Sequence, residues 1–232
     1  NIFNKILLNN FDKKNNESLK NITISDLSLF DYYYNPSIEK PSVTLVEKEN
    51  YKINIVNGLC KNYEDNNIEI RNIAVSDSKR FRDQNFENSE DIVIDFNRIF
   101  LNSGILFKIK TKNKININLI HEIHENYTIF QNNFFYFEKN CEIKIDDEFE
   151  LSNNTINNIN YNIQVEEGAD IKHNIFQNIS SSSKLYLTSN TVCEQKSSFT
   201  QNSYNFSDGY VRNFHYAKLN GRFSRAFLQG CF

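Results

Sequence analysis

Histidine and cysteine side chains are the first candidates for chemistry in this sequence, because both residue types bind metals. His121 and His124 lie three residues apart in the segment His121-Glu-Ile-His124. On a strand this spacing directs the two imidazoles to opposite faces. We therefore interpret both as surface histidines and not as ligands. Cys193 and Cys231 could supply thiolates to an iron–sulfur centre, which needs several converging sulfurs. No cysteine stands beside either in the sequence, so we interpret both as buried or idle thiols.

A run of carboxylates resembles the acid and base pair of a hydrolase. Asp146, Asp147, Glu148 and Glu150 follow one another closely. Because acidic residues of this density are usually hydrated, we interpret the run as a solvated acidic turn.

Lysines form a second charged pattern, on alternate positions. Lys108, Lys110, Lys112 and Lys114 would make one basic stripe along a strand. Isoleucines and Phe107 occupy positions that alternate with the lysines, so we interpret the stripe as the solvent face of strands. A partner-binding strip is the alternative.

Composition and missing motifs exclude several classes of function. No phosphate-binding loop of the GxxxxGK[ST] type is present, so we expect any ATP hydrolysis to come from a partner. The net charge of −3 gives no basic surplus for a nucleic-acid partner. No apolar run approaches the ~18 to 20 residues of a membrane helix, so we expect no membrane partner.

The four cysteines, Cys60, Cys141, Cys193 and Cys231, lie far apart and form no CxxC pair. This spacing argues against a disulfide framework and a zinc knuckle. We expect reduced thiols and a cytoplasmic location, or the plastid stroma if the organism has plastids.

The elements that position these residues divide the chain into two parts. We predict a mixed α/β region and link over residues 1–90, in which Pro36 and Pro41 interrupt helical structure. The expected elements are a helix over Ile2–Leu8, a helical turn over Ser25–Phe30, strands over Val43–Val46, Tyr51–Val56 and Asn67–Val75, and a charged link over Ser76–Glu90 that is either mobile or helical. Asn57-Gly58 is typical of a tight turn.

Residues 91–232 form a series of short alternating strands with almost nothing at helical spacing. Such strands fit a sandwich, a barrel or a β-helix. We favour a β-helix, because few Gly or Pro hairpin turns separate the strands and Asn tolerates the left-handed backbone of solenoid corners. Nucleotide bias is the other explanation for the 39 Asn residues. The strands expected are Ile105–Thr111, Ile115–Ile120, Asn133–Phe137, Cys141–Ile145, Phe149–Leu151, Asn160–Val165, Ile171–Ile179, Lys184–Ser189, Ser197–Phe206, Tyr210–Leu219 and Phe223–Leu228.

The C-terminal segment carries a family resemblance. Arg212, Asn213, Leu219, Gly221 and Gly230 match the spacing of an R-N-x-x-x-x-x-L-x-G signature followed by a later glycine. This signature resembles that of the SufB/SufD family, the β-helical partners of the SufC ATPase. The segment Tyr51–Gly58, ending in Gly58, is similar to a strand of SufD-like members. The segment Asn97–Lys110 resembles the start of the first coils, with Gly104 as its glycine.

The resemblance implies an all-β fold with a right-handed parallel β-helix over 91–232, incomplete at its C-terminus. It implies a non-catalytic scaffold subunit that pairs with a SufB-like subunit and couples to the SufC ATPase. The complex would assemble the iron–sulfur cluster, and no catalytic, metal or cofactor residue is assigned to this chain. The signature residues would be structural.

Two other functions remain open for a β-solenoid, since one fold hosts unrelated functions. A polysaccharide-active enzyme would require converging carboxylates or basic residues on one exposed face. A structural or adhesin-like solenoid would be expected to show regular sequence repeats, and none is visible.

Overall fold

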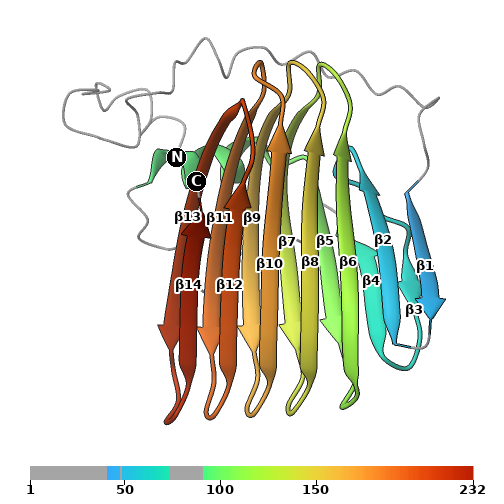
Figure 1. Ribbon diagram of the computed structural model, residues 1–232, viewed down its shortest axis with the longest axis vertical. Helices are drawn as coiled ribbons and strands as arrows, with labels where there is room; N and C mark the ends of the chain where they lie inside the picture. The colour runs from blue at the N-terminus through green and yellow to red at the C-terminus, as the bar shows by residue number, and fades with distance from the viewer. Residues whose placement is uncertain (1–40, 48, 74–90, 232) are drawn as a thin grey trace.

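The computed structural model describes residues 41–47, 49–73 and 91–231. These residues are nearly all β, and their parallel strands stack into a β-solenoid of about five turns (Figure 1). Each turn, called a coil below, contributes one strand to each of two facing sheets. The predicted β-helix is therefore confirmed, and the sandwich and the barrel are excluded.

Sheet A and sheet B each have seven strands in the described residues. Sheet A runs in the order β1 (Ser42–Glu47), β2 (Asn50–Val56), β6 (Lys114–Ile123), β8 (Glu142–Leu151), β10 (Asp170–Ile179), β12 (Ser198–Asn205) and β14 (Arg225–Cys231). Sheet B runs in the order β13 (Tyr210–Leu219), β11 (Lys184–Cys193), β9 (Ile156–Val165), β7 (Thr128–Phe137), β5 (Ser103–Ile109), β4 (Ile68–Asn72) and β3 (Tyr63–Glu64).

The coils have a constant length that the sequence does not reveal. Register partners in successive coils, such as Lys114 and Glu142 in sheet A, lie 28 residues apart, and the same spacing holds between β7, β9 and β11. Only the last coil is shorter, since Ser189 pairs with His215, 26 residues on. Because residue types vary from coil to coil, this structural period has no matching sequence repeat.

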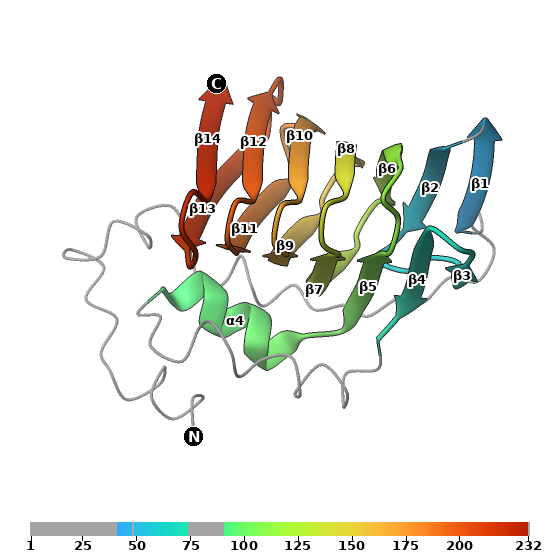
Figure 2. The ribbon, with the colours of Figure 1, turned by 90° about the horizontal axis from the view of Figure 1, so that it is seen from below.

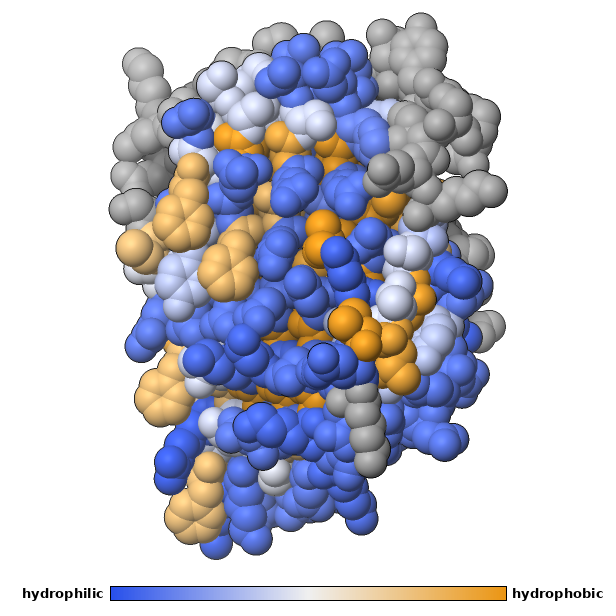
Figure 3. Space-filling view, turned by 45° about the vertical axis from the view of Figure 1, so that its right-hand side comes forward, coloured by the Kyte–Doolittle hydropathy of each residue, from blue (hydrophilic) through white to orange (hydrophobic). Residues whose placement is uncertain are grey.

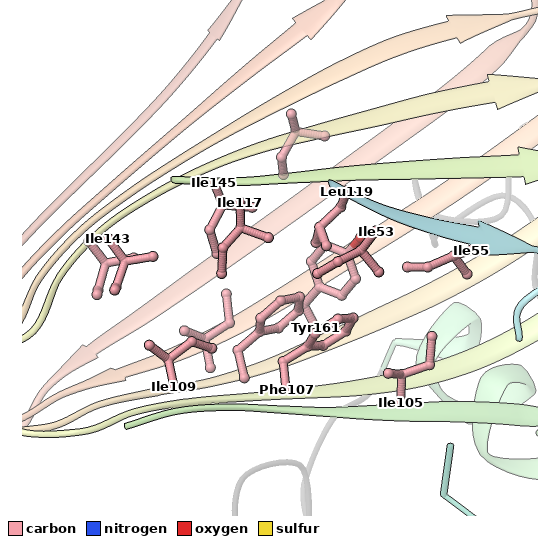
Figure 4. Packing of buried hydrophobic residues seen from close by; sticks show 14 of the residues in the cluster. Ile53, Ile55, Ile105, Phe107, Ile109, Ile117, Leu119, Ile143, Ile145 and Tyr161 are labelled. Carbon is pink, nitrogen blue, oxygen red and sulfur yellow. The ribbon is translucent and has the colours of Figure 1, made fainter. Parts of the chain in front are cut away.

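Alternation of side chains builds the solenoid interior. In β6, β8 and β10 every second residue is buried, as expected of strands with one face on a core. Figure 4 shows Ile117, Leu119 and Ile145 of sheet A facing Phe107 and Tyr161 of sheet B. Hydrophilic residues dominate the outside in the view of Figure 3.

Asparagine fills many of the corners, as predicted. The backbone is left-handed at six corner positions, each two residues before a strand begins: Asn126, Asn140, Asn154, Gly168, Lys196 and Phe223. Asn adopts this conformation more readily than other non-glycine residues, because its short side chain bonds locally. The corner interpretation of Asn is thus confirmed at three of these positions.

The N-terminal strands close one end of the solenoid. β1 pairs with β2 in antiparallel fashion, and β2 continues sheet A by pairing in parallel with β6. Asn57 and Gly58 both have positive φ, 48° and 77°, which confirms the predicted tight turn. On the other sheet, β3 and β4 extend β5. Because Ile53 and Ile70 belong to the same core as the coils, this part of the N-terminal region is packed as an extension of the β-helix.

One helix was missed by the sequence prediction. α4 (Ile92–Phe100) lies where strands were expected, and it covers the outer face of sheet B across β7 and β9 (Figure 2). Asp91 caps its first turn by accepting a hydrogen bond from the backbone N–H of Val93 at 3.0 Å. Asn97 anchors the helix, because its buried amide donates to the backbone carbonyls of Gln131 and Asn158.

Several predicted elements differ in extent. Cys141–Ile145 and Phe149–Leu151 are one strand, β8, because the acidic residues between them continue the alternation. The predicted helix over Ile2–Leu8, the turn over Ser25–Phe30 and the whole link over Ser76–Glu90 lie outside the described residues. Among the residues that the structure does describe, no helix has the length and apolar character needed to cross a membrane.

The corner conformation leads to a first prediction. Replacing Asn140 by Val places a β-branched residue at φ 60°, where it costs about 1–2 kcal/mol. We expect Asn140→Val to lower the free energy of unfolding by about that amount in urea denaturation followed by circular dichroism. Asn178→Val is the control, because Asn178 is an exposed strand residue of β10. Equal losses in the two variants would contradict the corner assignment.

Candidate functional site: a chain of polar side chains inside the solenoid

The buried carboxyl group of Asp147 lies at one end of a chain of polar side chains in the solenoid interior. Its Oδ2 accepts a hydrogen bond of 2.7 Å from the hydroxyl of Tyr161, in the facing sheet. The same oxygen lies 3.0 Å from Nε2 of His173 in β10. On the other side of β8, Nε2 of His121 lies 3.1 Å from Oδ1. All four side chains have an exposed fraction of 1% or less.

These contacts fix the charge of the carboxyl group. Burial alone raises the pKa of Asp147, but electrostatic attraction and hydrogen bonds from the imidazoles of His121 and His173 outweigh it and hold the pKa well below its ordinary value. Burial, followed by the charge of Asp147 and the hydrogen bond to it, raises the pKa of Tyr161 well above 10. At neutral pH, Asp147 is therefore an anion and Tyr161 a donor.

From His173 the chain of hydrogen bonds continues toward the last coil. Nδ1 of His173 lies 3.3 Å from Nε2 of Gln201, and Oε1 of Gln201 accepts from the hydroxyl of Ser189 at 2.8 Å. Ser189 Oγ lies 2.9 Å from Nδ1 of His215. Nε2 of His215 lies 3.0 Å from Oγ of Ser203. The chain thus joins β8, β10, β11, β12 and β13.

All donors in this chain point the same way. A carboxylate only accepts, so Nε2 of His173 donates to Asp147, and its Nδ1 accepts from the amide of Gln201. Because the hydroxyl of Ser189 donates its proton to Gln201, its oxygen accepts from Nδ1 of His215. The other nitrogen of the neutral ring, Nε2, then accepts from Ser203. Each bond polarises the next, and the aligned dipoles stabilise the buried anion.

The chain supports a charge but does not conduct a proton. Gln201 interrupts it with an amide, which does not readily take up or release a proton near neutral pH. Ser203 and His215 have the spacing of a nucleophile and its base. However, Nδ1 of His215 donates to Ser189 and not to a carboxylate, and Ser203 is 2% exposed. The arrangement fits a structural element better than an active site.

The structure corrects two interpretations of the sequence. His121 is not a surface residue, because it points inward from β6 and stacks on Phe149 with ring centroids 4.4 Å apart. His124 lies one residue beyond β6, so the strand argument for opposite faces does not reach it. The acidic run is not a turn but the middle of β8, and Asp147 alone among its acids points inward.

A signal for these buried residues was present in the sequence. Asp147 is separated by an even number of residues from Ile143, Ile145 and Phe149, which point inward, so it lies on the same face of the strand. His121 likewise lies two residues from Leu119 and shares its inward face of the strand. His173, Tyr161 and His215 could be assigned to the interior in the same manner, but which of them meet depends on pairing between the two sheets.

Arg212 and Asn213 lie within β13, although a coil corner satisfied by an Asn side chain is the commoner role for such a pair. Nη2 of Arg212 is 2.5 Å from Oδ2 of Asp91, so it connects the last coil to the cap of α4. Asn213 points inward and forms two reciprocal amide bonds with Gln177, of 2.7 and 2.9 Å. These two signature residues hold β13 from its outer and inner faces.

The other signature positions are scattered along the solenoid. A side-chain carbon on Gly221 would lie 2.3 Å from the backbone nitrogen of Gln195, so only glycine fits where these two corners stack. Gly104 lies in β5 opposite Asn132, and Gly230 lies in β14 opposite Ser203. Leu219 ends β13, and Gly58 forms the turn after β2; the structure therefore does not gather the signature into one site.

The cysteines do not form a shared site in the described residues. Cys60, Cys141 and Cys193 are buried, and burial raises their thiol pKa values to about 12, 12 and 11. Cys231 is exposed at the end of β14. Cys193 ends β11, next to the corner where β12 begins, whereas Cys231 lies at the opposite edge of the sheets. They are separated by roughly the ~20 Å length of a strand.

The lysine stripe is divided by the fold. Lys108 lies on β5 and pairs with Glu138, and Lys110, one residue beyond β5, pairs with Glu64 and Glu69. Lys114 begins β6 in the other sheet and pairs with Glu142. Lys112 lies in the corner between them. These acidic partners and the split between two sheets leave no continuous basic strip.

A shallow groove lies along one row of corners beside sheet A. Glu122, Glu150, His124 and Asp208 are among the side chains that line it. Glu122 and Glu150 are register neighbours on the outer face. Over the described part of the chain, no group of three or more His, Cys, Asp or Glu side chains is arranged to hold a metal ion.

Comparison with known proteins adds one finding. Residues 120–232 match the family model described as SUF system FeS cluster assembly, SufBD core domain. The match supports kinship with the SufB/SufD family and a role in SUF iron–sulfur cluster assembly, without separating SufD from SufB. Neither the curated proteins nor the solved structures gave a match.

The role of Asp147 can be measured directly. We expect Asp147→Asn to lower the free energy of unfolding by about 3–5 kcal/mol, because an amide in place of the anion leaves the donors around it without a charge partner. The control is Asp146→Asn, which changes the neighbouring outward carboxyl group that accepts from Lys144 and Asn174. There we expect a loss of about 1 kcal/mol or less. Similar losses in both variants, measured by urea denaturation, would sink the assignment.

Proposed function

We propose that this chain is a non-catalytic scaffold subunit of a SUF-type iron–sulfur cluster assembly complex. In this proposal it is a SufD-like subunit that pairs with a SufB-like subunit and is coupled to the SufC ATPase. The observation that carries the proposal is the match of residues 120–232 to the SufBD core domain. The strand Tyr51–Val56 with its Asn57-Gly58 turn favours the SufD-like assignment.

The side chains of the described residues support a scaffold better than a catalyst. The most buried acid, Asp147, is surrounded by donors inside the coils, and three of the four thiols are buried with raised pKa values. Both features disfavour a nucleophile or a ligand at the surface. We therefore propose that the cluster is cargo of the complex, ligated mainly by residues of other subunits.

The solenoid also has the mechanical character of a scaffold. Hydrogen bonds between successive strands of both sheets run along its whole length. Contacts are between neighbouring coils, so its shape is set by repeated local interfaces. We propose that this stiffness keeps partner-binding surfaces at fixed separations during the ATPase cycle. The four free cysteines fit a reducing compartment such as the cytoplasm or the plastid stroma.

Co-expression tests the proposed partners. The full-length protein, tagged, would be produced together with SufB-like and SufC-like proteins from the same organism. We expect a stable three-component complex on affinity purification and size-exclusion chromatography, with ATP hydrolysis only when the SufC-like protein is present. The control replaces the SufC-like protein by an unrelated ATPase of similar size. Failure of the tagged, folded chain to retain the SufB-like protein would contradict the scaffold proposal.

Cluster loading of the same complex tests the assignment of the ligands. We expect Cys231→Ser to leave the visible absorption of a reconstituted iron–sulfur cluster unchanged within error, because no other cysteine of the described residues lies near it. The matched control is Cys193→Ser, a buried thiol at the opposite edge. Loss of cluster absorption in Cys231→Ser alone would show that this subunit supplies a ligand.

A further inference from the structure

The helix α4 lies across the strands of sheet B, and its two ends are bonded to strands that do not touch each other (Figure 2). At its first turn, Asp91 accepts a hydrogen bond from Nη2 of Arg212 in β13. Just beyond its last turn, the side chain of Asn102 accepts from the backbone N–H of Phe130 and donates to the carbonyl of Thr128, both at 3.1 Å. The helical segment therefore connects β13 with β7, although β9 and β11 lie between these strands.

Buried polar bonds fix the middle of the helix to the sheet. The amide of Asn97, which is 1% exposed, donates to the backbone carbonyls of Gln131 in β7 and Asn158 in β9, at 3.0 and 2.6 Å. In return, the amide of Asn158 donates to the carbonyl of Val93 at 2.8 Å. If the helix slid along the sheet, these buried groups would lose their partners. The bonds therefore define one position of α4 on sheet B.

An apolar cluster, separate from the solenoid core, follows the same path across the sheet. The cluster and the side chains packed against it come from the helix and from four strands: Val93, Phe96 and Phe100 of α4, Phe130 of β7, Ile156 of β9, Tyr186 of β11 and Tyr210 of β13. Burial of these side chains holds the helix to all four strands at once.

The length of α4 matches the distance that it has to cross. Its nine residues span about 13 Å as an α-helix. β7 and β13 are three strand spacings apart, which is about 14 Å. In a simple solenoid each coil contacts only its neighbours, so a single element that reaches four coils is an addition to that architecture.

We propose that α4 is a strap that joins coils which do not touch one another, so that the coil carrying β7 and the coil carrying β13 loosen together. Without a strap, a disturbance weakens as it passes from one coil interface to the next. Here the helix transmits it directly from Asn97 to Arg212. The strap stiffens sheet B along the solenoid axis, whereas no helix among the described residues crosses sheet A.

Residue-specific hydrogen exchange on the 232-residue chain tests the strap through Asn97→Ala. This change removes the amide that binds β7 and β9, and it touches neither Asp91 nor Arg212. Because two buried carbonyls lose a donor, we expect exchange to become roughly tenfold faster in α4 and, by the same factor, in β13.

The matched control is Asn162→Ala, the same chemical change on the outer face of β9. Asn162 donates to Asn132 of β7 and has no bond to α4. We expect exchange in β13 to change by less than about twofold in this variant. Faster exchange of α4 in Asn97→Ala with β13 unchanged would overturn the proposal, because the helix would then be a local cover of β7 and β9. Equal acceleration of β13 in both variants would overturn it too.

If Asn97→Ala does not fold, Asp91→Asn takes its place. Asparagine caps a helix as well as aspartate does, but this change removes the charge that Arg212 binds. The informative amide is then that of Asn102, which donates to the carbonyl of Phe130 at the other end of the helix. Faster exchange of this amide supports the strap, and unchanged exchange there refutes it.

Discussion

Parallel stacking in constant register is the constraint on which the rest of this structure depends. Because most coils contain 28 residues, each inward side chain lies directly on the inward side chain of the next coil. A residue's environment is then set by the residues at the same level in neighbouring coils. Ile115 and Ile143 make an apolar level of this kind, whereas His173 and Gln201 make a polar one. A shift of one residue would exchange the inner and outer faces of a whole strand.

The same constraint explains how a buried charge is tolerated. An isolated carboxylate in an apolar interior is costly, and burial acts on Asp147 in that direction. Strands on both sides of β8 bring imidazoles to it, and the facing sheet brings the hydroxyl of Tyr161. Since removing one partner of such a group leaves the others unpaired, the polar chain ties the relative positions of several coils together. Asp147 is thus better understood as a register-fixing group than as a reactive one.

Much of the fold could be predicted from alternation and turn residues. The strands of the second half, the Asn57-Gly58 turn and the left-handed Asn corners were all expected. α4 was missed because Ile92, Val93 and Phe96 follow a helical spacing within a region read as strands. For the site, the alternation of side chains along the strand could by itself have placed Asp147 in the solenoid interior. Its contact with Tyr161 depends on which levels of the two sheets face each other, and local sequence does not encode that.

The polar interior also changes along the solenoid axis. In β6 and β8 the inward residues are mostly isoleucine or leucine, and β12 contributes Gln201 and Ser203 at equivalent levels. Apolar levels gain stability from any close packing, whereas polar levels require each donor to meet its acceptor. The isoleucine and leucine levels of β6 and β8 therefore do not depend on one particular partner. At Gln201 and Ser203 of β12, by contrast, removing one donor or acceptor leaves its partner unpaired, so these levels also determine which strand lies beside which.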